Sequence, residues 1–224
     1  MSACPSGSSG TDAATDAIQQ IANAAVRGLA LRGTVRRYRK GTILIEEGDR
    51  GETLYIILAG RLRAYSAAAN GREITYGIYG PGEYLGEMSL DGGVRCASVA
   101  TTEAAVCAVI ARETLREYIQ EFPDFAFELL SKVIRRARAA TLSAKNLALN
   151  DVYGRLKLLL ECQPCELKGG LTVIGERLTH LDLANRIGCS REMISRVMKD
   201  LENGGYVELR EGRIAMRRPL PARW

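Results

Sequence analysis

The sequence predicts an α+β protein in which a β-roll, one long helix and a winged helix-turn-helix follow one another along the chain. Short β-branched segments separated by glycines run from about Val35 to Val109, a heptad of apolar residues follows, and the last third alternates helical segments with two short strands. The expected boundaries are a disordered tail over 1–16, the roll over 17–121, the long helix over 122–150 and the winged unit over 151–224.

The composition limits the class of protein. The 224 residues carry a formal net charge of +5, which admits a nucleic-acid partner. No apolar run reaches the ~18 residues of a membrane span. The opening MSACPSGSSGTDAATD lacks the basic and apolar regions of a signal peptide, so we expect a cytoplasmic protein with no membrane partner. Its small polar residues predict the disordered tail.

Chemistry that needs several histidines is excluded, because His180 is the only one. The six cysteines lie far apart except for Cys162 and Cys165. This pair has no second pair to complete a zinc site, so we expect reduced thiols, and a redox role for the pair stays open. The sequence offers no nucleophile–base arrangement and no glycine-rich nucleotide loop. We therefore expect no catalytic residue, no metal and no enzymatic activity.

The roll is predicted from RYRKGTILIEEGDRGETLYIILAGRLRAY, whose short alternating strands have glycines at their turns. The Asn-Gly pair in ANGRE (69–73) is a hairpin signal, and YGPGEYLGE adds a further turn. Many short strands at regular spacing favour a roll or barrel.

The long helix is predicted from apolar residues at alternating spacings of three and four. They are Leu130, Val133, Ala137, Ala140, Ala144 and Leu147. Alanine in the middle of this narrow seam would allow two helices to approach closely. We favour a dimer seam over packing of the helix on its own roll, because an intramolecular face is usually wider.

The C-terminal unit is predicted from the helical segments DVYGRLKLLLE, LTHLDLANRIG and SREMISRVMKDLENGG and from the strand pair in YVELREGRIAM. Thr179 with Asp182 resembles a capping box, Gly188 fits a left-handed C-cap, and Ser190 fits the N-cap of the third helical segment. The buried stripe of that segment is expected to be Ile194, Val197, Met198 and Leu201. The residues left facing outward are Arg191, Glu192, Ser195, Arg196 and Lys199.

These outward residues have the chemistry of a base-reading surface. In such motifs the N-terminus of the second helix enters the major groove, where arginine can bind guanine and glutamate can accept a hydrogen bond from cytosine. The alternative is a solvated surface with an ion pair between Glu192 and Arg196, which have i,i+4 spacing. The capped helix, the glycine turn and the wing together favour base reading.

GCSRE…R…K at this spacing resembles the recognition helix of the cyclic-AMP receptor protein/fumarate-nitrate regulator (Crp/Fnr) family of bacterial transcription regulators. The resemblance covers nearly the whole chain after the first thirty residues. It implies base contacts in a TGTGA-like half-site from Arg191, Glu192 and Arg196. It places Thr179, His180, Ser190 and Lys199 at or near phosphates. His180 stands where the best-known member has arginine.

YLGEMSLDGGVRCASV is similar to the phosphate-binding cassette of cyclic-nucleotide-binding rolls. The resemblance implies a ligand-binding set of Gly86, Glu87, Met88, Arg95, Cys96 and Ala97, joined by Ala140 and Thr141 of the long helix. Arg95 would neutralise the cyclic phosphate with a forked donor, and Glu87 would accept from the ribose 2′-hydroxyl. Gly86 would allow close backbone approach.

The cassette departs from its relatives in three ways. It is one residue short between Gly86 and Arg95, Cys96 replaces the usual serine or alanine, and Ala140 stands where the cyclic-AMP sensor has a base-contacting threonine, although Thr141 keeps a hydroxyl. The resemblance therefore implies a cyclic-nucleotide effector but does not identify its base. Cyclic AMP and cyclic GMP are favoured, and a cyclic dinucleotide remains an alternative.

The expected function is that of a homodimeric transcription factor that binds palindromic double-stranded DNA under effector control and contacts RNA polymerase. One alternative is an effector-independent DNA-binding dimer with a degenerate sensor. Another is a cyclic-nucleotide-binding module that regulates a protein partner, against which the outward surface of Arg191, Glu192 and Arg196 argues.

Overall fold

The computed structural model describes residues 9–223 and confirms the predicted fold class, with mixed helices and strands. Its contacts divide the chain into two compact units. Of the described residues, the first unit is made of 9–66 and 77–137, and the second of 67–76 and 138–223.

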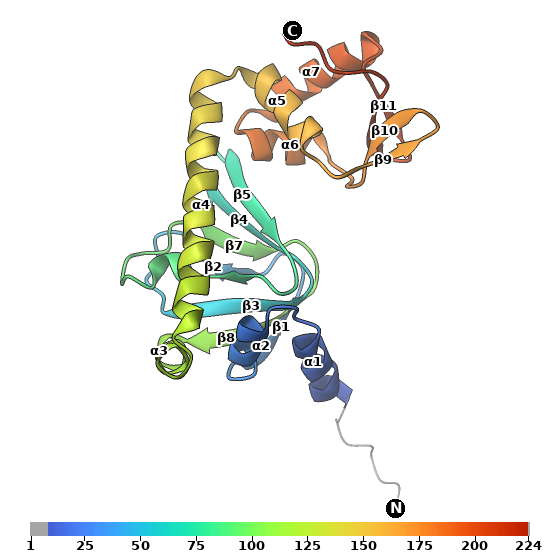
Figure 1. Ribbon diagram of the computed structural model, residues 1–224. Coiled ribbons are helices and arrows are strands. Elements are labelled where there is room, and N and C mark those ends of the chain that lie inside the picture. The colour runs from blue at the N-terminus through green and yellow to red at the C-terminus, as the bar shows by residue number, and fades with distance from the viewer. Residues whose placement is uncertain (1–8, 224) are drawn as a thin grey trace, which may run out of the picture. The chain divides into compact units, whose positions relative to one another are not determined.

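The first unit is built on two four-stranded sheets, with strand orders β1-β8-β3-β6 and β2-β7-β4-β5 (Figure 1). The strands are β1 (Thr34–Tyr38), β2 (Ile43–Ile45), β3 (Thr53–Ala59), β4 (Leu62–Ala67), β5 (Glu73–Tyr79), β6 (Tyr84–Leu85), β7 (Ser98–Thr101) and β8 (Ala105–Ala111). β4 and β5 flank the predicted 69–73 turn and continue into the second unit. The central β8 pairs antiparallel with β1 and β3. The first sheet therefore joins strands from both ends of the roll sequence.

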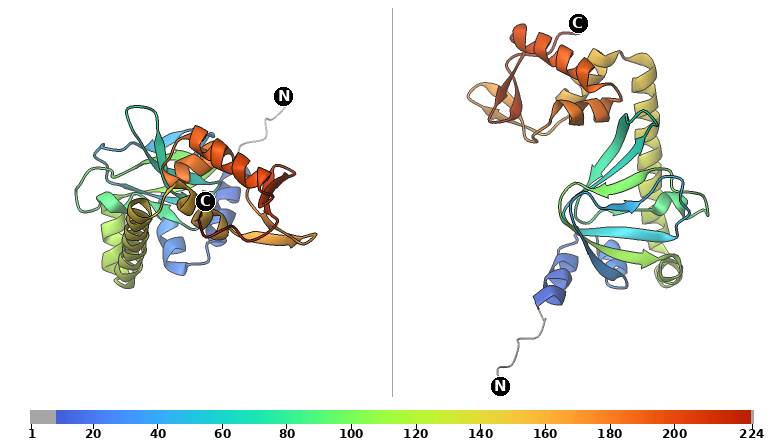
Figure 2. Two further views of the ribbon diagram at one scale, coloured as in Figure 1. Left: turned by 90° about the horizontal axis from the view of Figure 1, so that it is seen from above. Right: turned by 180° about the vertical axis from the view of Figure 1, so that it is seen from behind.

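Four helices cover the outer face of the first sheet. They are α1 (Ser9–Gln19), α2 (Ala24–Ala30), α3 (Arg112–Glu121) and the start of α4 (Asp124–Leu149). Along β3, Leu54, Ile56 and Leu58 face these helices, whereas Ile57 faces the second sheet, as the two-residue period of a strand requires. Figure 2 shows α1 and α2 against the strands of this sheet from behind.

The structure differs from the predicted disordered tail over residues 9–16, because α1 begins at Ser9. Ala14 and Ile18 lie four residues apart, so they share one face of α1, and both are buried in the roll unit. This packing stabilises a segment whose polar composition alone favours disorder. Residues 1–8 lie outside the described part of the chain.

Besides the end of α4, the second unit contains three short helices and a four-stranded sheet of order β11-β12-β10-β9. The elements are α5 (Val152–Glu161), β9 (Cys165–Lys168), β10 (Leu171–Ile174), α6 (His180–Ile187), α7 (Arg191–Asn203), β11 (Val207–Arg210) and β12 (Arg213–Met216). β11 and β12 form the predicted wing hairpin, whose two turn residues Glu211 and Gly212 both have positive φ. The sequence does not predict the β9–β10 hairpin, which turns at Gly169 and Gly170.

The helix α4 carries exposed apolar side chains along most of its length. Phe127 is 70% exposed, Leu130 53%, Ile134 41% and Leu147 43%. The seam alanines Ala137, Ala140 and Ala144 are exposed as well. Apart from the half-buried Val133, the predicted seam is therefore left exposed among the described residues.

Candidate functional sites

The cassette backbone turns sharply between β6 and a single 3-10 turn, Glu87–Ser89. Gly86 caps this turn with a φ of 102°. A Cβ on Gly86 would lie 2.5 Å from the carbonyl oxygen of Thr53 and 2.9 Å from Nη1 of Arg95. The turn therefore requires glycine here, both for its left-handed conformation and for the close approach.

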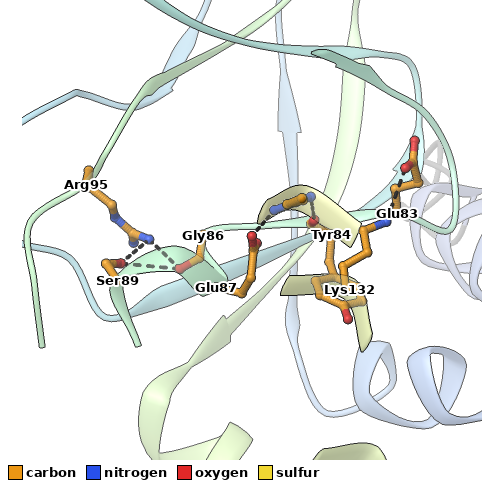
Figure 3. Close-up of polar contacts among 8 residues, drawn as sticks. Glu83, Tyr84, Gly86, Glu87, Ser89, Arg95 and Lys132 are labelled. Atoms are coloured by element: carbon orange, nitrogen blue, oxygen red, sulfur yellow. Dashed lines mark hydrogen bonds and ion pairs between the residues drawn. The ribbon is translucent and has the colours of Figure 1, made fainter. Parts of the chain in front are cut away.

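Arg95 is buried beside this turn, with 6% of its surface exposed. Nη1 donates to the Gly86 carbonyl at 2.8 Å and to Ser89 Oγ at 2.9 Å, and Nη2 donates to the Thr53 carbonyl at 2.8 Å and to Thr53 Oγ1 at 3.1 Å. Figure 3 shows Arg95 directed at Gly86 and Ser89. All four accepting oxygens are uncharged. Burial lowers the pKa of Arg95, and a guanidinium nevertheless stays charged in proteins.

Glu87 is also buried, at 4% exposed, and it points toward α4 and away from Arg95 (Figure 3). One carboxylate oxygen forms an ion pair with Nη1 of Arg136, whose Nη2 donates to the Tyr84 carbonyl at 2.7 Å. The second carboxylate oxygen, Oε2, is buried and has no hydrogen-bond partner within the described residues. Buried carboxylate oxygens usually accept a hydrogen bond, so Oε2 is free to accept one from a bound group.

A second cation of α4 approaches the same strand. Lys132 pairs with Glu83 at 3.2 Å and lies 5.3 Å from the ring centre of Tyr84. Burial raises the pKa of Tyr84 well above its usual value. Neither Lys132 nor Arg136 is among the site residues expected from the sequence. They are four residues apart and lie off the apolar heptad positions, so they share one polar face of α4, and this pattern could have identified them.

The other predicted cassette residues lie nearer the surface. Met88 is 44% exposed, Cys96 is exposed and Ala97 is half buried. Ala140 and Thr141 are exposed residues of α4 and belong to the second unit, so their part in the site stays a prediction.

The helix-turn-helix has the caps that the sequence predicts. Thr179 and Asp182 form a reciprocal capping box at the start of α6. Gly188 ends α6 in the left-handed conformation, with a φ of 72°. Ser190 caps α7 by accepting a hydrogen bond from the backbone N–H of Met193. These local bonds fix where α7 begins, and so which side chains stand at its N-terminus.

The predicted buried stripe of α7 lies in the core of the second unit, and it consists of Ile194, Val197, Met198 and Leu201. Arg191, Glu192, Arg196 and Lys199 are exposed. Ser195 differs from the expectation that it faces freely outward, because it is half buried and its Oγ lies 2.9 Å from Nδ1 of His180. Hydrogen bonds to its own backbone N–H and to Ser190 lower the pKa of Glu192.

Other kinds of site receive no support within residues 9–223. No group of three or more histidine, cysteine or acidic residues could hold a metal ion there. No helix of this part is long and apolar enough to cross a membrane. Cys162 ends α5, Cys165 opens β9, and both are exposed free thiols.

Two domain families match this chain. The cyclic nucleotide-binding domain matches residues 35–122, and the Crp-like helix-turn-helix domain matches residues 156–219.

Similar proteins cover most of the chain. The cyclic AMP receptor protein of Thermus thermophilus is 34% identical over 188 residues, which cover 81% of this chain and 83% of that protein. The CRP-like cAMP-activated global transcriptional regulator of Mycobacterium tuberculosis is 31% identical over 176 residues, with 77% and 79% covered. The solved structure of the c-di-GMP responsive global regulator CLP of Xanthomonas campestris is 27% identical with a TM-score of 0.77, and 88% of this chain and 100% of that chain are covered.

Proposed function

The chain belongs to the Crp family of transcription regulators, with a cyclic nucleotide-binding domain ahead of a Crp-like helix-turn-helix domain, and on this premise we propose that it is a homodimer whose DNA binding is controlled by a cyclic nucleotide. The N-terminus of α7 carries the proposal, because it presents Arg191, Glu192 and Arg196 at a capped, exposed helix end. In each protomer α7 would enter a major groove and read G·C pairs.

The other contacts on this side would be made with phosphates. The α6 cap residue Thr179, the first residue His180 and the α7 cap residue Ser190 lie at helix N-termini, where backbone N–H groups favour anions. Lys199 is an exposed cation two turns further along α7. Such contacts position the protein on the duplex without reading sequence.

The hydrogen bonding of the cassette supports nucleotide binding by the first unit. Oε2 of Glu87 lacks a donor, which a ribose 2′-hydroxyl would supply. Within residues 9–223 the hydrogen bonds of Arg95 go to four uncharged oxygens, so a cyclic phosphate would give its guanidinium a charged acceptor. Arg136 and Lys132 of α4 also reach the cassette, where they pair with Glu87 and Glu83. These features favour a working sensor over a degenerate one.

The effector proposed first is cyclic AMP, for which the Thermus thermophilus and Mycobacterium tuberculosis relatives are named. Cyclic GMP is the next candidate, because Ala140 and Thr141 leave base reading open. The Xanthomonas campestris regulator is described as responsive to c-di-GMP, which makes a cyclic dinucleotide the third. Met88, Cys96 and Ala97 would complete the wall of the site.

Homodimerisation is supported by the exposed apolar stripe of α4, which two copies would bury against each other. The dimer would bind a palindrome in the cytoplasm, with half-sites roughly 10 bp apart, and contact RNA polymerase there.

Isothermal calorimetry with cyclic AMP, cyclic GMP and cyclic di-GMP tests this function, together with selection of bound duplexes from a random library. The proposal expects one nucleotide to bind and to change the affinity for a selected palindrome, since linkage requires both effects together. Selection of a palindrome without binding of any nucleotide would favour the effector-independent dimer.

A further inference from the structure

His180 and Ser195 contact each other across the helix-turn-helix. His180 is the first residue of α6, Ser195 lies in the second turn of α7, and Nδ1 of the imidazole is 2.9 Å from the serine Oγ. Both side chains are half buried. The serine hydroxyl is thus hydrogen-bonded to His180, which the sequence predicts to be a separate contact with DNA.

The place of Ser195 on α7 puts this pair beside the proposed reading surface. Ser195 comes four residues after Arg191 and four before Lys199, so the three share one row along the helix. Arg191 and Lys199 are exposed at the two ends of the row, whereas Ser195 between them is half buried in contact with the imidazole. In the middle of this row, the imidazole of His180 therefore covers the serine hydroxyl.

The hydroxyl determines what the imidazole can offer. A neutral imidazole has one donor and one acceptor nitrogen, so a hydroxyl that donates to Nδ1 leaves the ring proton on Nε2. In the other neutral tautomer Nδ1–H donates to the serine Oγ, and Nε2 is then an acceptor. A phosphate oxygen can only accept, so it favours the tautomer in which the hydroxyl donates to Nδ1 and Nε2 is an N–H donor.

We propose that Ser195 is a positioning residue for DNA binding. Its hydroxyl holds the His180 ring so that Nε2–H donates to a backbone phosphate, and Ser195 itself does not touch DNA. The phosphate is the partner because His180 stands at the N-terminus of α6, outside the helix that reads bases, where the helix dipole also favours an anion. This inference rests on the proposed function.

A double-mutant cycle separates positioning from direct contact. Ser195→Ala, His180→Ala and the double variant are compared with wild type on the selected palindrome and on an unrelated duplex, at fixed salt. Alanine suits a helix interior, so Ser195→Ala should leave α7 folded, which thermal unfolding checks. Ser195→Ala should weaken binding roughly fivefold per half-site, the value of one net hydrogen bond. In the His180→Ala background it should have no further effect.

Matched variants test the geometry. In His180→Gln the side-chain amide can place a donor where Nε2 stands, whereas in His180→Asn it reaches only the position of Nδ1. The glutamine variant should therefore keep most of the affinity, and the asparagine variant should resemble His180→Ala. Ser195→Thr, which retains the hydroxyl, should rescue binding. Losses should be similar on both duplexes, as expected for a phosphate contact.

Three outcomes would overturn the inference. Equal losses from Ser195→Ala with and without His180 would mean that the serine contacts DNA itself. A His180→Ala loss confined to one base position would mean that the imidazole reads a base. If the wild type binds no duplex, the proposed function fails together with the inference, whereas wild-type binding without coupling overturns only the positioning role of Ser195.

Discussion

Removal of Arg136 should destabilise the roll more than removal of the charge on Glu87. The two form a buried ion pair in which the side chain of Glu87 is 0% accessible and that of Arg136 is 16% accessible. In Arg136→Met the carboxylate would stay buried with neither oxygen bonded, because Oε2 already lacks a partner. In Glu87→Gln the arginine would keep the Tyr84 carbonyl as an acceptor.

The magnitudes follow from this asymmetry. Breaking a buried pair costs about 3–5 kcal/mol when one charge is left unpaired, so Arg136→Met should fall in that range. Glu87→Gln also leaves a charge without its partner, but it should cost only about 1–2 kcal/mol, because Arg136 is partly accessible to water and the amide oxygen can still accept from its guanidinium. The double variant should recover much of the loss, because two uncharged side chains need no counter-charge in the interior.

Thermal unfolding followed by circular dichroism measures this series. A loss of 1 kcal/mol corresponds to roughly 2–4 °C in a chain of this size, so the difference between the single variants is resolvable. Addition of the effector should raise the melting temperature of the wild type more than that of Glu87→Gln, which has lost the acceptor proposed for the ribose. If the two single variants lost equal free energy of unfolding, and these losses added in the double variant, the assignment of a coupled buried pair would be refuted.

Three further predictions concern the other parts of the proposed function. Arg95→Leu should abolish nucleotide binding in calorimetry, because the phosphate would lose the buried guanidinium as its donor. Binding that survives unchanged would place the nucleotide site elsewhere. Ala140→Glu should dissociate the dimer or abolish DNA binding by setting two charges face to face on α4; sedimentation of the wild type as a monomer at micromolar concentration would contradict the seam. Arg191→Ala should cost about 1–3 kcal/mol per half-site and relax one base position, whereas Lys199→Ala should weaken all sequences alike and reduce the salt dependence; identical profiles on single-base variants of the palindrome would mean that α7 does not read bases.

The sequence predicts best what short-range hydrogen bonding determines. The capping box at Thr179, the left-handed Gly188 and the Ser190 cap involve residues within a few positions of one another, and the structure has all three. The hairpin around 69–73 is likewise set by local turn chemistry.

Contacts between distant segments could not be predicted in this way. Glu87 meets Arg136, 49 residues away, and no pattern in either segment names the other. Helix α1 is stable because Ala14 and Ile18 pack in the roll unit, which its own composition does not reveal. The contact of Ser195 with His180 depends on how α6 lies against α7, so periodicity assigns Ser195 to the outward set when it is in fact half covered.

The pairing of β1 with β8 has a consequence for biosynthesis. Thr34 lies opposite Val109, so the first strand to leave the ribosome has no partner in its sheet until the end of the roll sequence has been translated. We expect the nascent roll to expose an unpaired strand edge throughout this interval, whereas the helix-turn-helix can fold from neighbouring segments as they emerge. Chaperone dependence and loss to aggregation should therefore be concentrated in the N-terminal half of the chain, and an increase in the rate of translation should affect that half first.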